Sequence, residues 1–201
     1  MIDYLLADWP RHALIDPARI GMVGHSAGGF TALVIAGGEP DLNIGLRRCQ
    51  DRPQAWDCQY LKQHGLDLQT RPALPPQTWV HDPRIKALVI AAPCCGWMFQ
   101  PKGLLTVHIP IELWDAQQDP IVEDSPAIIR DLLPTPPKEH VLANAGHFAF
   151  LAPCDPGMKA YFAQAAERGQ LDICADPVGF DRIAFHEQFN AGIVAFFSKA
   201  L

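Results

Sequence analysis

Gly24 to Gly28 place a serine between two glycines in the pattern G-x-S-x-G. The apolar runs 19–23 before it and 29–36 after it predict a strand, a tight turn and a helix. In that setting Ser26 is expected to stand exposed at the start of the helix as a nucleophile. The backbone N–H of Ala27 would then face a developing oxyanion. The turn is expected to be too sharp for a side chain at either glycine. A glycine-rich turn with an incidental serine is the alternative, because the pattern alone is weak.

A serine hydroxyl is a poor nucleophile at neutral pH unless a base removes its proton and a third group orients that base. Asp119 follows the strand-like run 109–114, and His147 follows the run 139–143. Both therefore come after Ser26 in the chain, each just beyond the carboxyl end of a strand. We expect the three side chains to converge on one rim of the sheet, with His147 as base and Asp119 as the orienting acid.

Asp115 competes with Asp119 for the orienting role, but it lies at the edge of the strand, where it could cap a turn. Asp119 lies farther out on the loop and precedes Pro120, which fixes the turn, so Asp119 is favoured. Four other histidines fit the role of base less well. His25 lies inside the turn and His186 at the start of a C-terminal helix, while His64 and His81 lie in or beside segment 39–83, where exposed positions are expected.

The composition bounds the class of protein. The chain has 201 residues, of which 49% are hydrophobic and 19% charged, as in an ordinary globular domain. Its net charge of −6, with no cluster of lysine or arginine, argues against a nucleic-acid or anionic-membrane partner. No apolar run is long enough to cross a bilayer, and residues 1–8 lack the features of a signal peptide.

Six cysteines are many for a cytosolic enzyme of this size, and none forms the C-x-x-C spacing of a zinc site. Cys49 with Cys58, and Cys154 with Cys174, could each close a disulfide, which would place the protein in an oxidising compartment. Buried free thiols are an equal alternative. The neighbours Cys94 and Cys95 follow a buried strand, where plain packing is expected.

The remaining pattern alternates strands and helices, which predicts a parallel sheet covered on both faces in one α/β domain, 1–201. Segment 39–83 shows little periodicity, is rich in proline, and is expected to form a cap in which Trp56, Tyr60 and Trp79 shape an apolar pocket or pack locally. The expected strands are 19–23, 85–92, 109–114 and 139–143, and the expected helices are 2–9, 29–36, 125–133, 158–165 and 185–197.

Four stretches together resemble a dienelactone hydrolase-related branch of the α/β-hydrolases, which is itself similar to the platelet-activating factor acetylhydrolases. They are Asp16–Leu33, Trp114–Val122, Asn144–Cys154 and Phe180–Phe197. The resemblance implies a three-layer α/β/α fold and a serine hydrolase of carboxylic esters or lactones that needs no cofactor. It also implies Ser26 as nucleophile, Asp119 as acid, His147 as base and the Ala27 N–H as an oxyanion donor. It further implies periplasmic or secreted relatives that use cysteines such as Cys154 and Cys174 in disulfides.

One departure from this family concerns the first strand. Family members have a central sheet of about eight strands, with the strand before the serine near its middle, whereas here that strand comes first. The N-terminal strands, and the loop that supplies a second oxyanion N–H, are therefore expected to be missing. This predicts an exposed sheet edge that pairs with a second copy or with a missing N-terminal half. A weakly active or inactive binding module is the alternative function, and thioester, peptide or acyl-transfer chemistry would suit the same three residues.

Overall fold

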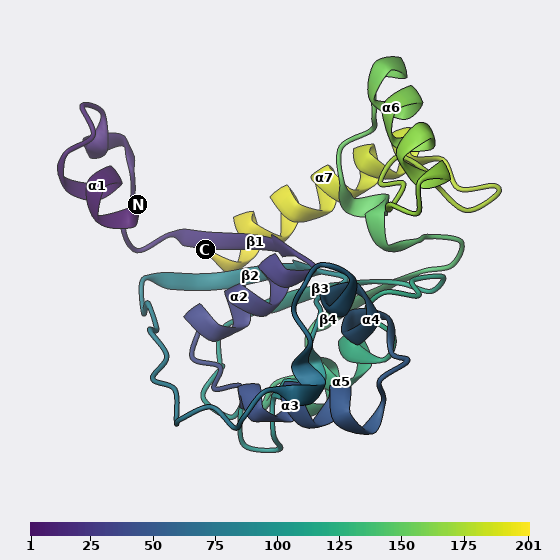
Figure 1. Cartoon of the computed structure of the whole chain (residues 1–201). Helices are drawn as coiled ribbons and strands as arrows, with labels where there is room; N and C mark the ends of the chain where they lie inside the picture. The colour runs from purple at the N-terminus through teal and green to yellow at the C-terminus, as the bar shows by residue number, and fades with distance from the viewer.

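The fold is built on a sheet of four parallel strands. The computed structural model describes all residues, 1–201 (Figure 1). The strands lie side by side in chain order as β1 (Ile20–His25), β2 (Ile85–Ala91), β3 (Ile111–Ala116) and β4 (Lys138–Leu142). This arrangement confirms the α/β class and the parallel sheet expected from the alternating pattern.

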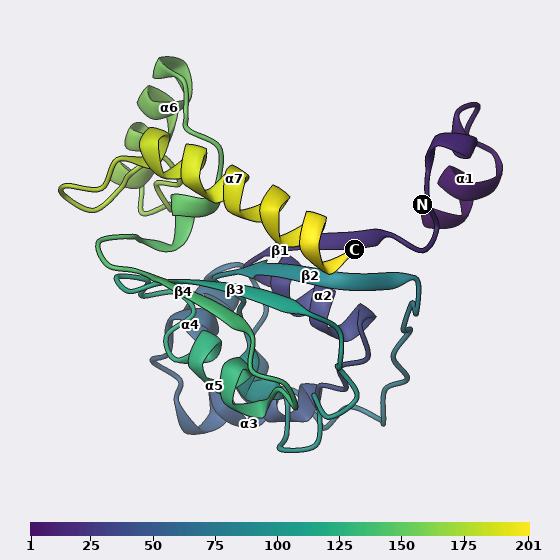
Figure 2. The same cartoon turned by 180° about the vertical axis from the view of Figure 1, so that it is seen from behind.

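Helices cover both faces of the sheet, as Figures 1 and 2 show from opposite sides. One face carries α2 (Ala27–Ile35), α3 (Leu42–Asp51), α4 (Trp56–Gln63) and α5 (Ser125–Leu132). The other carries α7 (Arg182–Ala200), with α6 (Pro156–Glu167) beside its N-terminal half, and α1 (Ile2–Ala7) lies beyond the start of β1. Short 3-10 turns are η1 (His12–Leu14), η2 (Leu68–Thr70), η3 (Gly96–Met98) and η4 (His147–Phe150).

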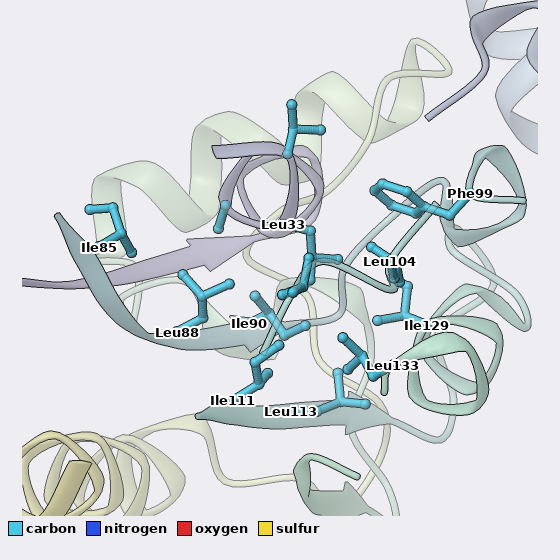
Figure 3. Close-up of a cluster of buried hydrophobic side chains, with 13 residues drawn as sticks. Leu33, Ile85, Leu88, Ile90, Phe99, Leu104, Ile111, Leu113, Ile129 and Leu133 are labelled. Carbon is cyan, nitrogen blue, oxygen red and sulfur yellow. The ribbon is translucent and has the colours of Figure 1, made fainter. Parts of the chain in front are cut away.

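The core is split by β2 into two clusters. Because side chains alternate along a strand, Leu88 and Ile90 point to one face, and Val89 and Ala91 point to the other. All four are at most 1% exposed, so the continuous apolar run is buried on both faces as predicted. The first cluster joins β2 and β3 to α2 and α5; Figure 3 shows Leu33, Leu88, Ile90, Leu113 and Ile129 meeting there.

The second cluster lies under α7. Phe185 and Phe189 pack with their rings against Trp114 of β3, at centroid distances of 6.1 and 5.1 Å. Farther along the helix, the Phe197 ring lies so close to β1 that a Cβ on Gly21 would be 2.3 Å from it. α7 therefore crosses the sheet in direct contact with the backbone of β1.

All the expected strands and helices form, with ends shifted by up to about three residues, and the main departures concern segment 39–83 and Asp115. No helix was expected in that segment, yet α3 and α4 lie within it. The Asp41 carboxylate caps α3 by accepting from the Asn43 N–H, a local signal that the proline-rich composition obscured. Asp115 lies within β3, not at its edge, because the strand runs on to Ala116.

Four of the six cysteines form disulfides, while Cys94 and Cys95 are free thiols. Cys49 of α3 is bonded to Cys58 of α4, and Cys154 is bonded to Cys174 across α6. Both cysteine pairs that the spacing suggested are thus joined. None of the helices has the length and apolarity required of a membrane span.

β1 forms one edge of the sheet, since its only neighbour is β2. Val23, midway along β1, keeps 51% of its surface exposed. The free N–H and C=O groups of such an edge can pair with another strand.

Candidate active site

Ser26 stands at the junction of β1 and α2 with φ 54° and ψ −118°, a positive φ that is rare for a residue with a side chain. Its N–H donates to the Ala91 carbonyl at 2.9 Å, and its carbonyl accepts from the N–H groups of Gly29, Phe30 and Cys94 at 3.0, 3.2 and 3.2 Å. These four hydrogen bonds hold the strained backbone in place. The Oγ is thereby fixed at the carboxyl end of β1.

Only one of the two glycines in the pattern is sterically required. A Cβ on Gly24 would lie 2.2 Å from the Gly28 carbonyl oxygen, so position 24 admits no side chain. A Cβ on Gly28 would meet nothing within 4 Å, and the prediction that both positions need glycine was wrong for it. The second close approach occurs one residue later, where a Cβ on Gly29 would lie 2.9 Å from the Cβ of Pro93.

His147 connects the serine to a carboxylate. It opens η4 at the end of the short loop after β4, and its side chain is 5% exposed. Its Nε2 lies 3.0 Å from the Ser26 Oγ, and its Nδ1 lies 2.6 Å from Asp119 Oδ2. With the proton on Nδ1 donated to Asp119, Nε2 is free to accept the proton of the serine hydroxyl. The structure thus brings together the three side chains that the sequence singled out.

Backbone groups of the loop after β3 hold the carboxylate oxygen of Asp119 that does not face His147. Its Oδ1 accepts hydrogen bonds from the N–H groups of Ile121 and Val122, at 2.8 and 3.2 Å, and the side chain is 2% exposed. One oxygen is thus held by the backbone, while the other is directed at the imidazole. Asp115, the competing acid, has no hydrogen bond to His147, and burial raises the pKa of its carboxyl.

His25 supports the site from the turn itself, a role the sequence did not suggest. Its Nε2 donates to the backbone carbonyl of His147 at 2.9 Å, and the two imidazole rings are 4.7 Å apart. Burial lowers the pKa of His25, and the neighbouring His147 lowers it further. A neutral His25 therefore links the end of β1 to the backbone of the proposed base. Its place directly before the serine was the one available signal.

The N–H of Ala27 belongs to the first residue of α2, where the N–H groups have no partner within the helix. An N–H at this end also carries the positive end of the helix dipole. It is therefore free to donate to a negative oxygen beside Ser26.

A cavity of about 350 Å³ opens above Ser26 and His147. Its lining is mostly apolar and comes from α4, the loop after β2, the loop after β3 and η4. Trp56 and Tyr60 of α4 contribute stacked rings, 5.0 Å apart, whereas Trp79 packs elsewhere and donates to the Pro40 carbonyl. The remaining lining residues are Arg48, Asp57, Leu61, Cys94, Cys95, Trp97, Ile121, Val122, Phe148 and Leu171.

Arg48 brings the cavity a positive charge that is already paired. Its guanidinium donates to Asp57 at 3.1 Å and to Glu123 at 3.0 Å, and it lies 4.7 Å from the centre of the Trp97 ring. Because both carboxylates neutralise it, Arg48 orders the cavity wall more than it attracts an anion.

The other titratable groups named from the sequence lie outside this arrangement. His186 is in the second turn of α7, not its first, and hydrogen-bonds to the Ala149 carbonyl at 3.0 Å. His64 and His81 are exposed. No three histidine, cysteine, aspartate or glutamate side chains lie together as a potential metal site.

No protein-family model matches the chain, and the comparison with curated proteins found no relative. Among solved structures, the chain is similar to one from a study of two esterases of the fungus Rhizomucor miehei and their substrate specificity. That match has 11% sequence identity and a TM-score of 0.39, and it covers 77% of this chain. The chain spans about half the length of that structure, 52%. A function for this chain therefore depends on the geometry of its own residues.

Proposed function

We propose that this protein is a serine hydrolase that cleaves carboxylic esters or lactones through an acyl-enzyme. The observation that carries the proposal is the hydrogen-bonded chain from Asp119 through His147 to Ser26, opening into an apolar cavity. A hydroxyl, an imidazole and a buried carboxylate in this order form the arrangement that activates a serine for acyl transfer. The sequence resemblance favours the dienelactone hydrolase-related branch within this class.

In the first half-reaction, the Ser26 Oγ attacks the ester carbonyl while His147 Nε2 takes the hydroxyl proton. The carbonyl π electrons move to its oxygen, and the Ala27 N–H donates to the oxyanion so formed. His147 is now an imidazolium, which the Asp119 carboxylate stabilises at 2.6 Å from Nδ1. Collapse of the intermediate breaks the bond to the alcohol, which leaves with the proton from Nε2.

In the second half-reaction, a water molecule replaces the alcohol. His147 takes one proton of that water as its oxygen attacks the acyl carbon. The Ser26 ester bond then breaks, and the serine recovers its proton from His147. For a lactone, the alcohol stays attached to the acyl group, and a hydroxy acid is the product.

The apolar cavity suggests that the substrate has a compact hydrophobic acyl or alcohol group. Its volume of about 350 Å³ lies near the lower end of the range of small-molecule sites. Ala27 is the only oxyanion donor that we assign.

Labelling with a fluorophosphonate tests the proposal, because this probe reacts with an activated serine. Wild type is expected to be labelled and to hydrolyse 4-nitrophenyl acetate, whereas Ser26→Ala should do neither. Ser198→Ala is the matched control, since this hydroxyl donates to the Val194 carbonyl on α7 and has no role in the proposed chemistry. A folded wild-type protein that is not labelled would contradict the proposal and favour a binding module.

A further inference from the structure

The two free cysteines lie next to each other in the wall of the same cavity. Cys94 and Cys95 both line it together with Ser26, and both are partly buried. Their Sγ atoms lie 2.8 Å apart, although adjacent residues need not direct their side chains toward each other. The proposed hydrolysis uses neither thiol.

The loop that carries the two cysteines is held in this conformation by a side chain of α5. The Ser125 hydroxyl donates to the Pro93 carbonyl and accepts from the Gly96 N–H, both at 2.7 Å, so one buried side chain spans the cysteine pair. Cys95 itself has φ 61°, in the left-handed region. A strained backbone, fixed on both sides, keeps the two sulfur atoms together.

The hydrogen bond between the two sulfur atoms also favours a thiolate at Cys95. The hydrogen bond shared with Cys94 lowers the pKa of Cys95, and the charge of Arg48 lowers it further, against the opposing effects of burial and Asp57. The same shared hydrogen bond, together with burial, raises the pKa of Cys94. A thiolate beside a thiol is the arrangement in which thiol–disulfide exchange begins.

We propose that Cys94 and Cys95 are a reversible redox pair in which a small disulfide compound oxidises the two thiols to a vicinal disulfide. The Cys95 thiolate attacks one sulfur of the compound, forming a mixed disulfide and releasing one thiolate. The Cys94 sulfur, after losing its proton, attacks Cys95 Sγ, closes the ring and releases the second thiolate. The two protons lost by the cysteines pass to the two released thiolates, so the compound is reduced to two thiols.

The geometry makes this disulfide easier to reduce than the other two. Consecutive Cα atoms joined by a trans peptide lie about 3.8 Å apart, shorter than the usual disulfide span of about 4.4–6.8 Å. Cys49–Cys58 and Cys154–Cys174 span 5.4 and 5.7 Å, within that range. A strained disulfide is more readily reduced, so the vicinal pair should respond to conditions that leave the other two intact.

The redox state of the pair should affect the proposed hydrolysis, and this step rests on the function proposed above. The Cys94 N–H donates to the Ser26 carbonyl and is one of the bonds that fix the nucleophile. Ring closure must rotate both side chains and distort the peptide between them. We expect oxidation to lower kcat/KM about fivefold, the effect of losing one neutral hydrogen bond.

The covalent part is tested without any activity measurement. Native protein is incubated with 2-hydroxyethyl disulfide, then alkylated, digested without reduction and analysed by mass spectrometry. The expected product is a peptide with residues 94 and 95 unalkylated and two hydrogens lighter, which mercaptoethanol restores to two alkylatable thiols. Two free thiols after oxidation, or a stable mixed disulfide with the reagent, would overturn the proposal.

Variants with a single cysteine in this loop test whether the redox state of the pair affects the proposed hydrolysis. Cys94→Ser and Cys95→Ser should each form only a mixed disulfide or none, and each variant's ester hydrolysis is compared between its own oxidised and reduced samples. The reversible fivefold change is expected in wild type and absent in each variant sample whose remaining cysteine is shown by mass analysis to be free, since a mixed disulfide would itself occupy the cavity. The same change in a variant with a free cysteine, or no change in wild type after ring closure, would overturn the coupling. If no hydrolysis is found, the mass analysis still decides whether the redox pair exists.

Discussion

Asp119→Asn is the substitution that tests the proposed catalytic chain most directly. Asparagine has nearly the same shape, so its oxygen can still accept from the Ile121 and Val122 N–H groups. Its NH₂ group must then face His147 Nδ1, which forces the ring proton onto Nε2. A protonated Nε2 donates to the serine oxygen and can no longer take its proton.

The size of the expected loss of activity follows from the distance between His147 Nδ1 and Asp119 Oδ2. An imidazolium and a carboxylate 2.6 Å apart attract each other by about 6 kcal/mol at an effective dielectric constant of about 20. That attraction exists only once the histidine is protonated, so it stabilises the transition state selectively. Since about 1.4 kcal/mol corresponds to a factor of ten, we expect kcat/KM to fall about 10⁴-fold.

Initial rates with 4-nitrophenyl acetate measure this loss, and the thermal midpoint shows whether the fold is retained. Asp115→Asn is the matched control, because this carboxyl lies on the same strand–loop segment without a bond to His147. We expect it to keep activity within about threefold of wild type, a change of under 1 kcal/mol in the barrier. An Asp119→Asn variant with more than a tenth of wild-type activity, or equal losses in both variants, would refute the assignment.

Three further predictions concern the turn, the neighbouring histidine and the sheet edge. Gly24→Ala should lower the free energy of unfolding by about 3 kcal/mol, because its Cβ would lie 2.2 Å from a backbone oxygen, whereas Gly28→Ala should change it by less than about 1 kcal/mol. Urea unfolding measures both, and equal losses would contradict the steric difference. Because burial holds the pKa of His25 below 6.5, the unfolded chain takes up this proton first, and stability should fall as the pH drops below 6.5. In the His25→Asn variant, the thermal midpoint should change less with pH between about pH 7 and 5 than in wild type. An equal change with pH in both proteins would exclude His25 as the cause. The unpaired edge of β1 predicts concentration-dependent self-association that Val23→Lys weakens, measured by size-exclusion chromatography with light scattering; a wild-type monomer at every concentration would refute it.

The sheet could be predicted from the sequence because its strands are buried and bounded by clear turn residues. β2 is the clearest case, with an uninterrupted apolar run that needs cover on both faces. α3 escaped prediction although Leu42, Leu46 and Cys49 follow helical spacing, because the prolines of the whole segment outweighed its local pattern. Composition averaged over a long segment therefore hid a helix within it.

The three proposed catalytic residues could be found because each follows a strand, and the ends of parallel strands share one rim. Their supporting contacts could not be found, because they depend on backbone groups. The bond from His25 to the His147 carbonyl joins residues 122 positions apart. The pairing of Cys94 with Cys95 depends equally on the Ser125 hydroxyl, which no local pattern places beside them.

The covalent bond between α3 and α4 limits how the cavity can admit a ligand. Cys49 and Cys58 tie the two helices a few residues from the stacked rings of Trp56 and Tyr60. The bond restrains the two helices from separating. We therefore expect the size of the group that the cavity accepts to be limited by the rings of Trp56 and Tyr60, and not to increase through separation of the two helices.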